Sequence, residues 1–330
     1  MLRSRFDNYA DALGPPEHRY YGSGYKRVSR YLTDLSVARS SLPGSTSTAV
    51  ARLIWSEDWT ARNYAGLVPR VSAVDALIIA AALCEAVIVR ARDLTETEAS
   101  TIWLRRVLIR SSGLCPADTK RIRVRVVLLN VVEGDLEVES TYLFRVGPLT
   151  GALTLAHPPG AVWISFQGSE VIDEFYSIYG LPGRHHYLEG LTSHELTATS
   201  LVVDETQARV TATQQISAAT AATPYVGAES KYADSVSFVD GIVGGAQLAQ
   251  ILLNHVGGGG VSENHFRLRK LEIVADTPAR SATDEFAGVA ELSRRKVFDR
   301  DGRRWLSAAV GITEFGGLTG SVSCTRPLAS

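Results

Sequence analysis

The chain repeats its own sequence at an offset of about 165 residues, and this repeat limits the folds that it can adopt. Four pairs of segments match in the same order along the chain: 5–24 with 171–190, 72–88 with 237–253, 104–107 with 268–271, and 149–155 with 318–324. Within the first pair, identical Asp, Gly, Pro, Tyr and Gly residues align at a constant offset of 166. Four ordered matches at a nearly fixed offset indicate duplication and fusion.

The repeat predicts two domains of ordinary size. The sequence His157-Pro158-Pro159-Gly160 is typical of a turn between two halves of the chain. We therefore expect an N-terminal repeat over 1–157, a linker over 158–170 and a C-terminal repeat over 171–330. Duplicated domains commonly pair as two subunits did before fusion, so we expect a pseudo-dimer within one chain.

Each repeat is predicted to contain one long buried helix. Ser72 and Asp75 form an S-x-x-D capping box, and Ser237 and Asp240 form the equivalent one. The segment that follows Ser72 has no polar stripe over about four turns, so this helix must be covered on every side.

The segments around the helices have the patterns of antiparallel strands. Residues 121–126 alternate strictly between polar and apolar, and 194–216 predicts two strands around a central turn. Glu133-Gly134-Asp135 and Asp301-Gly302 have the composition of hairpin turns. We expect an α+β fold in which an antiparallel sheet wraps one long helix, twice over. This arrangement resembles the tandem (double) hot-dog fold.

Composition argues against several classes of protein. Lys plus Arg number 34 against 35 Asp plus Glu, which gives no reason to expect a nucleic-acid partner. Cys84, Cys115 and Cys324 have no C-x-x-C spacing, and this favours a reducing compartment. The first residues lack the apolar run of a secretory signal. Residues 72–89 are long and apolar, but Asp75 and Glu85 make a membrane span costly. We expect a cytoplasmic protein.

Familiar catalytic signatures are missing from the sequence. There is no phosphate-binding G-x-x-x-x-G-K-[ST], no G-x-S-x-G and no H-E-x-x-H. Gly22-Ser23-Gly24 lacks the rest of a dinucleotide fingerprint. We therefore expect no cofactor and no metal ion.

The acidic residues of the two helices are the best lead to a site. Asp75 and Asp240 occur in both repeats and are candidates for substrate binding, although helix capping explains them as well. Glu85 lies where a charge would be buried, and its counterpart is Gln250. A carboxyl group in apolar surroundings suits a general acid or base near neutral pH. The alternative is a hydrogen-bonded core glutamate.

Other candidate site residues are polar groups on or near these elements. Gln247 and Gln250 share a helix face and can bind substrate oxygens or pair with backbone. Arg105 and Arg269 occupy matching strand positions beside Arg106 and Lys270, and one member of each pair should point inward. An inward arginine could stabilise an oxyanion. His18, His185 and His186 lie in the repeated Gly/Pro/Tyr segment and are acid–base candidates, but His18 matches Arg184.

Three segments resemble the avirulence D protein family along almost the whole chain. They are LGPPEHRYYGSGYKRV at 13–28, VSAVDALIIAAALCE at 71–85 and WLRRVLIR at 103–110. Members of that family direct production of acylated sugar-derived lactones of the syringolide type. The implied reaction is similar to that of the A-factor synthase family of hot-dog proteins, which are associated with a helix Glu and a second-half Arg. Glu85 matches the first in type and element, and Arg269 is the candidate for the second.

The resemblance implies an acyl-condensing enzyme. It would join a β-ketoacyl chain, carried as a thioester on an acyl carrier protein or CoA, to a small sugar-derived hydroxy-ketone to give a butenolide or lactone. The alternatives are a hot-dog dehydratase or thioesterase acting on acyl thioesters, and a non-catalytic protein that binds a lipid or lactone. A dehydratase normally pairs a His with a carboxylate, and neither of the helix segments 72–88 and 237–253 nor the approach at 66–70 carries a His.

Overall fold

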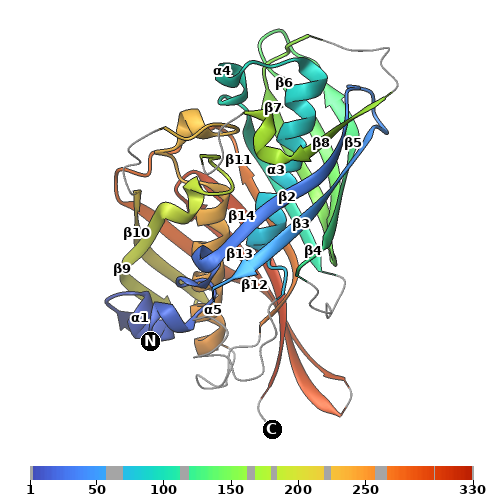
Figure 1. Cartoon of the computed structure of the whole chain (residues 1–330). Helices are drawn as coiled ribbons and strands as arrows, with labels where there is room; N and C mark the ends of the chain where they lie inside the picture. The colour runs from blue at the N-terminus through green and yellow to red at the C-terminus, as the bar shows by residue number, and fades with distance from the viewer. Residues whose placement is uncertain are drawn as a thin grey trace. The chain divides into compact units, whose positions relative to one another are not determined.

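The computed structural model describes most of the chain and divides it into two compact units (Figure 1). The described residues are 3–56, 70–111, 119–161, 168–179, 184–218, 224–256, 266–300 and 302–328. We name each unit after its long helix, α3 (Ala73–Arg92) or α5 (Phe238–Val256). The α3 unit contains Tyr25–Ser193 and Ala219–Ala233, and the α5 unit contains Met1–Gly24, His194–Ala218 and Asp234–Ser330.

Helix α3 begins where its sequence predicts. Ser72 accepts a hydrogen bond from the Asp75 amide, and the Asp75 carboxylate accepts one from the Ser72 amide, so the predicted capping box is present. Asp93 ends the helix in the left-handed conformation, with a φ of 52°. Every residue from Ala73 to Val89 is buried, as the missing polar stripe predicts.

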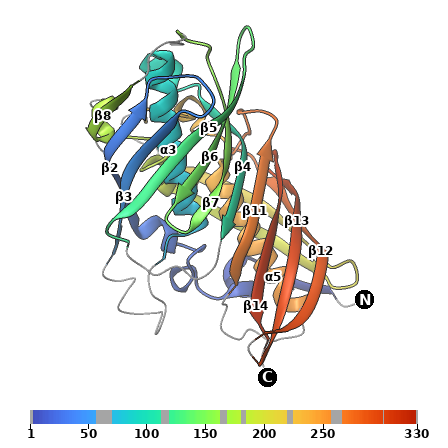
Figure 2. The same cartoon turned by 90° about the vertical axis from the view of Figure 1, so that its right-hand side faces the viewer.

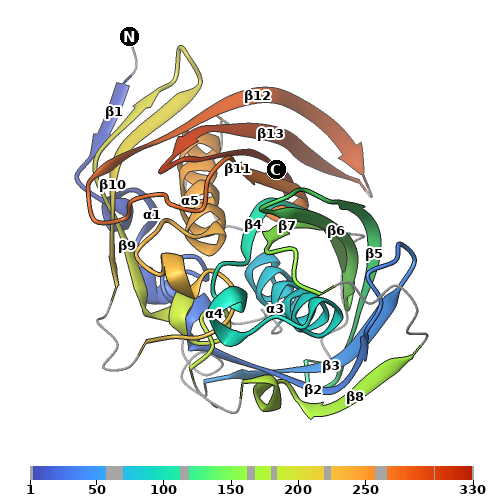
Figure 3. The same cartoon turned by 90° about the horizontal axis from the view of Figure 1, so that it is seen from above.

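The α3 unit surrounds its helix with an antiparallel sheet. The order across the sheet is β4-β7-β6-β5-β3-β2-β8. Helix α3 contacts β2 to β7, and Figure 3 shows these strands curving around it. The strands are β2 (Val28–Ala38), β3 (Thr46–Trp55), β4 (Trp103–Ser111), β5 (Ile122–Val132), β6 (Val138–Val146), β7 (Leu149–His157) and β8 (Ser169–Glu174). Short helices in this unit are α4 (Glu96–Ala99), η3 (Phe175–Ile178), η4 (Gly190–Ser193) and η5 (Ser230–Tyr232).

The α5 unit has the same plan. Its antiparallel order is β11-β14-β13-β12-β10-β9-β1, and α5 contacts β9 to β14. The strands are β1 (Arg3–Phe6), β9 (His194–Asp204), β10 (Arg209–Ala218), β11 (Arg267–Ala275), β12 (Phe286–Arg300), β13 (Arg303–Phe315) and β14 (Leu318–Pro327). Short helices are α1 (Tyr9–Leu13) and η1 (Pro16–His18), while η2 (Gly24–Arg27) bridges the boundary of the two units.

The internal repeat is visible in the strand order, with one exchange. Equivalent strands follow the same order in both units, as a duplicated sequence predicts. However, β1 of the first repeat pairs with β9 in the α5 unit, and β8 of the second repeat pairs with β2 in the α3 unit. Each repeat therefore contributes its first strand to the sheet around the other repeat's helix. The boundaries 1–157, 158–170 and 171–330 remain our prediction for the duplicated segments themselves.

The strand and turn predictions are confirmed where the structure describes them. Strands β5 and β6 form a hairpin around Glu133-Gly134-Asp135, and β9 and β10 pair on either side of 205–208. Gly302 lies in the turn between β12 and β13, while Asp301 is outside the described residues. All neighbouring strands within each unit are antiparallel, so the predicted antiparallel α+β class is correct.

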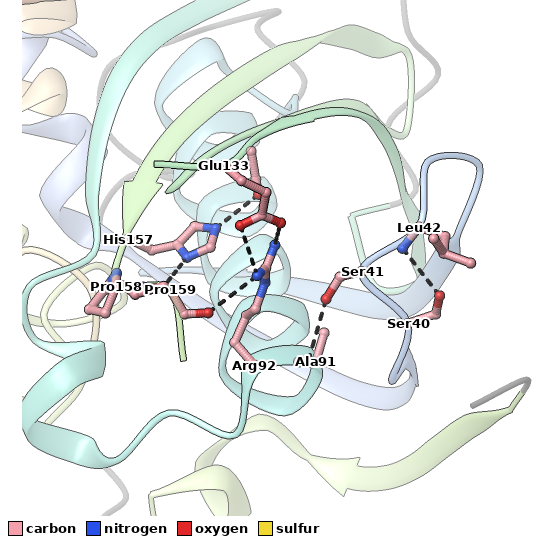
Figure 4. A network of polar contacts seen from close by, with 10 residues as sticks. Ser40, Ser41, Leu42, Ala91, Arg92, Glu133, His157, Pro158 and Pro159 are labelled. Carbon is pink, nitrogen blue, oxygen red and sulfur yellow. Dashed lines mark hydrogen bonds and ion pairs between the residues drawn. The ribbon is translucent and has the colours of Figure 1, made fainter. Parts of the chain in front are cut away.

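The turn after β7 is fastened to the end of α3 (Figure 4). Arg92 is buried, and its guanidinium pairs with Glu133 at 2.6 Å and donates to the Pro159 carbonyl at 3.2 Å. His157 Nδ1 donates to the Pro158 carbonyl at 2.7 Å, so its Nε2 is the acceptor for the Ser140 hydroxyl at 2.9 Å. These contacts hold the 157–160 turn to the α3 unit.

Candidate active site

Glu85 is the centre of a buried polar cluster in the α3 unit. Its side chain is fully buried on α3, among residues that are otherwise apolar. Oε2 lies 2.9 Å from Nε2 of His185, and Oε1 accepts a hydrogen bond from the Tyr179 hydroxyl. Both carboxylate oxygens therefore have a donor, which is what a buried carboxylate requires.

The backbone around His185 fixes the orientation of its ring. The amide of Leu188 donates to Nδ1 at 3.3 Å, so Nδ1 is an acceptor and the ring proton lies on Nε2, facing Glu85. The ring of Phe175 packs edge-on against His185 with centroids 4.8 Å apart. This tautomer makes His185 a hydrogen-bond donor to the Glu85 carboxylate.

Tyr179 is a second donor to Glu85. Burial, followed by the nearby Glu85 carboxylate, raises the pKa of Tyr179 well above its usual value. The phenol therefore keeps its proton near neutral pH, and it can donate to Glu85 but cannot serve as a base. Among the described residues, Glu85 is thus the proton acceptor of this cluster, and His185 and Tyr179 are its donors.

Glu189 holds the backbone of His185 in place. Its Oε2 accepts a hydrogen bond from the His185 amide at 2.8 Å, and its Oε1 accepts one from the Tyr176 hydroxyl. Burial raises the pKa of Glu189, although the hydrogen bonds from Tyr176 and His185 oppose this. Glu189 therefore fixes the backbone that carries the imidazole.

The segment 226–229 packs directly against the Glu85–His185 pair. Gly227 has a φ of +90°, and a Cβ at this position would lie 2.5 Å from both Glu85 Oε1 and His185 Nε2. Only glycine fits here, because both the conformation and the close approach exclude a side chain. Buried Glu229 anchors the segment by accepting from the Tyr187 hydroxyl at 2.7 Å and from the Leu104 amide at 3.0 Å.

The two helix-capping aspartates have structural partners. Asp75 forms an ion pair with Arg30 at 2.8 Å, and neither side chain is exposed. Asp240 accepts from Ser237 and lies 3.0 Å from His194 Nδ1. Burial raises the pKa of Asp240, but His194 and the hydrogen bonds from Ser237 outweigh it and hold this pKa below its usual value. These contacts agree with helix capping, and the substrate-binding roles of Asp75 and Asp240 stay predictions.

The equivalent position in the α5 unit carries a different pair. The offset of 166 places Arg19 opposite His185, because 19 plus 166 is 185. Arg19 Nη1 donates to Oε1 of buried Gln247 at 2.6 Å. Gln250, the counterpart of Glu85, is half-buried on α5. An arginine and a glutamine do not exchange protons near neutral pH. Of the two sets of equivalent positions, only the one in the α3 unit therefore carries a carboxylate and an imidazole, while the α5 unit has Gln250 and Arg19 there.

Contrary to our prediction, the strand arginines do not point inward. Arg105 and Arg269 each occupy the extra position of a β-bulge, one in β4 and one in β11. The bulge interrupts the two-residue alternation, so Arg105 and Arg106 both face outward between the buried Leu104 and Val107. Arg105 pairs with Glu137 and Glu139 at the surface.

The remaining candidates lie at the surface of the α5 unit or outside the cluster. Arg269 and His18 are both exposed. His186 is buried and packs against Tyr187 and Tyr225 rather than Glu85. Of the candidate residues, the structure therefore places Glu85 and His185 in the buried acid–base cluster.

His185 and Tyr179 are the functional residues that we did not predict as partners of Glu85. The expectation that no His accompanies the helix carboxylate is wrong, because His185 comes from a segment 100 residues away. The sequence repeat did not indicate this pairing, because the segment 171–190 joins the α3 unit instead of the α5 unit.

The described residues contain neither a metal-binding cluster nor a membrane-spanning helix. No group of three or more His, Cys, Asp or Glu side chains is arranged to hold a metal ion. No helix in the described part of the chain has both the length and the apolar character needed to cross a membrane.

Comparisons with known proteins identify the family. Several solved structures are similar over most of the chain, at low identity. The pyran synthase domain from module nine of the sorangicin pathway is 15% identical, with 90% of this chain and 98% of that chain covered and a TM-score of 0.39. The dehydratase domain of the polyketide PpsC from Mycobacterium tuberculosis is 12% identical, with 90% and 98% covered and a TM-score of 0.35. A hot-dog-fold protein from Alicyclobacillus acidocaldarius is 11% identical, with 88% and 96% covered and a TM-score of 0.36.

Sequence comparison is more decisive. A comparison with curated proteins found no match. The family model described as Pseudomonas avirulence D protein (AvrD) matches residues 4–328, which is nearly the whole chain. This chain therefore belongs to the AvrD family.

Proposed function

We propose that this protein is an enzyme of acyl-thioester chemistry whose acid–base centre is the Glu85–His185 pair. The observation that carries the proposal is the burial of this pair, with the Nε2–H of His185 directed at the carboxylate. A buried carboxylate held by oriented donors is typical of proton transfer at a catalytic site. We further infer that each unit is one hot-dog domain of a tandem pair.

The reaction that we propose joins a β-ketoacyl thioester to a small sugar-type hydroxy-ketone. In the first step, the acceptor hydroxyl attacks the thioester carbonyl, the C–O bond forms, the C–S bond breaks and the thiol leaves with the hydroxyl proton. In the second, the carbon between the two carbonyls loses a proton and attacks the acceptor ketone. Loss of water then gives a butenolide. Overall, the thioester and the hydroxy-ketone are converted into the butenolide, the thiol and water, and this conversion requires no redox cofactor.

The cluster supplies the proton transfers that these steps need. Glu85 is the base, and the acceptor hydroxyl, and later the acidic carbon, takes the position at Oε1 that the Tyr179 hydroxyl holds. His185 and Tyr179 donate hydrogen bonds to the developing charge, and the protonated Glu85 returns the proton to the leaving group. The roles predicted for Arg269 as a catalytic residue and for Gln247, Gln250 and Arg105 in substrate binding stay predictions.

A second candidate function is dehydration of a β-hydroxyacyl thioester. The specific observation in its favour is the His–carboxylate pair, which we had expected to be missing. Dehydration uses the same groups in the last step of the condensation, removal of a proton beside a carbonyl and protonation of a leaving hydroxyl. The two reactions differ in whether an acceptor is joined to the acyl chain.

Mass spectrometry of a reaction with purified protein separates these candidates. With a β-ketoacyl thioester and a ketose, condensation gives a product with the mass of both substrates minus the thiol and water. With a β-hydroxyacyl thioester alone, a dehydratase gives loss of water. If neither mass change occurs but an acyl-lactone binds tightly, the protein is a non-catalytic binder and the proposal fails.

A further inference from the structure

The outer face of the sheet in the α3 unit carries a dense group of positive charges. Two adjoining grooves of about 350 and 710 Å³ lie on this face. We define the basic face as the six exposed cationic residues that line them: Arg52, Lys120, Arg121, Arg123, Arg125 and Arg145. Among the described residues that line the grooves, Asp34 is the only acid. Because the whole chain has a net charge of -1, this excess is local.

The positions of these residues in the sheet oppose folding stability. Arg125 on β5 lies directly opposite Arg145 on β6. Like charges in a cross-strand pair are destabilising, so stability alone does not explain this choice of residues. The α5 unit contains both arrangements, because Arg209 on β10 lies opposite Glu291 on β12 and pairs with it at 3.2 Å, whereas Arg300 on β12 lies opposite Arg303 on β13. A face that tolerates self-repulsion is typical of a surface that binds an anionic partner.

The dimensions of the basic face fit one helix of a protein. Arg121 directly precedes β5, and Arg123 and Arg125 follow on this strand, so the three residues extend over about 13 Å at 3.3 Å per residue. The neighbouring strands β3 and β6 add about 10 Å of width, which is close to the diameter of an α-helix. Figure 2 shows β3, β5 and β6 side by side, with α3 behind them. About two turns of an acidic helix match this area.

We propose that the basic face docks an acidic helix of the carrier protein that delivers the acyl thioester. This inference rests on the proposed function, because the reaction needs an acyl chain bound to a carrier. A protein fits better than a nucleic acid, since nucleic-acid-binding domains are basic overall and this chain is close to neutral. Docking at this face would mean that a carrier protein, and not CoA, delivers the thioester.

Charge reversal tests the docking. The variant R123E/R125E/R145E changes the net charge by six, and R294E/K296E/R303E makes the same change at exposed positions of the α5 unit. Binding of a fluorescently labelled, acylated acyl carrier protein is measured by anisotropy for wild type and both variants. We expect the first variant to bind about tenfold more weakly or worse and the second to bind within about twofold of wild type. Wild-type binding should also weaken as salt is raised.

Three controls complete the experiment. Arg125→Glu alone places an acid opposite Arg145, so it should leave Tm unchanged or raised and show that reversal is compatible with folding. Turnover of a short N-acetylcysteamine thioester, which has neither carrier nor nucleotide, should be equal in wild type and R123E/R125E/R145E. The thioester of CoA should also be turned over equally by these two proteins.

Several outcomes would overturn the docking proposal. Equal carrier binding by both triple variants would do so, as would tighter binding of a short DNA duplex than of the carrier at physiological salt. A selective loss of CoA turnover in R123E/R125E/R145E would assign the face to nucleotide phosphates instead. Because binding is measured without turnover, selective loss of carrier binding together with inactivity of every thioester would support the docking face and refute the proposed reaction.

Discussion

Oε2 of Glu85 lies 2.9 Å from Nε2 of His185, although the two residues are 100 positions apart in the sequence. The carboxylate comes from the long helix of the first repeat, and the imidazole comes from the opening segment of the second. The two repeats therefore each contribute one half of a single buried pair. On the predicted boundaries of the repeats, neither repeat alone holds both residues of the pair.

Replacing His185 should reduce catalysis more than it reduces stability. His185→Gln removes the ring that donates to Glu85, and we expect kcat/KM to fall by about 100-fold. Tyr179→Phe removes one donor and keeps the ring, so a fall of about tenfold is expected. Steady-state kinetics measures the loss of catalysis, and thermal unfolding of the same variants measures the loss of stability. A His185→Gln protein with wild-type kcat/KM would remove the imidazole from the mechanism.

Gly227→Ala should damage the pair directly. The new methyl group would lie 2.5 Å from Glu85 Oε1 and His185 Nε2. We expect a loss of activity and a decrease in the free energy of unfolding of about 1–3 kcal/mol. Gly44→Ala is the matched control, because Gly44 also has a positive φ, of 93°, with nothing within 4 Å of the added methyl. Equal effects of the two substitutions on activity would show that backbone strain alone is responsible.

Asp75→Asn should act on stability. It leaves the buried Arg30 guanidinium without its carboxylate, which costs about 3–5 kcal/mol in comparable buried pairs. The double variant Arg30→Met/Asp75→Asn removes the uncompensated cation and should recover part of this loss. Denaturant unfolding measures both. An Asp75→Asn protein that keeps its stability but binds substrate poorly would contradict this expectation and support the predicted substrate-binding role of Asp75.

Stability should fall on acidification through the titration of His157. Burial lowers the pKa of His157 from 6.5 to about 4, against the hydrogen bond to Pro158 that opposes it. Between these two values the unfolded state binds the proton and the folded state does not, so the free energy of unfolding decreases as pH falls from about 6.5 to about 4. The maximal contribution is roughly 3 kcal/mol. Above pH 6.5 this contribution is constant.

The control for this prediction is His157→Gln, which keeps polar groups beside Ser140 and removes the titration. The difference in stability between wild type and His157→Gln should change with pH across this window. A difference that stays constant from pH 7 to pH 4 would mean that His157 titrates equally in the folded and unfolded states.

Local features of the fold could be predicted because they depend on neighbouring residues. The capping boxes at Ser72 and Ser237 and the apolar run after Ser72 define two helices through contacts within a few residues. The turn at 133–135 similarly follows from its composition. The burial of Glu85 followed from its position in a helix that is apolar on every side.

The site could be predicted only in part because its other members come from distant segments. No local pattern indicates that 171–190 joins the α3 unit, and so His185 could not be assigned to Glu85. The strand arginines show a different difficulty. A β-bulge at Arg105 and at Arg269 shifts the alternation of buried and exposed side chains by one residue. The sequences of 104–107 and 268–271 do not indicate this shift.

The turnover of Glu85→Gln measures the central claim most directly. The substitution keeps the size of the side chain but removes the proton acceptor, and its single amide oxygen can accept from only one of the two donors, His185 and Tyr179. With a β-ketoacyl thioester and a ketose, and with product measured by mass spectrometry, kcat/KM should fall by about 100- to 10,000-fold while the variant remains folded. A folded Glu85→Gln protein with full turnover would contradict the assignment of Glu85 as the catalytic base.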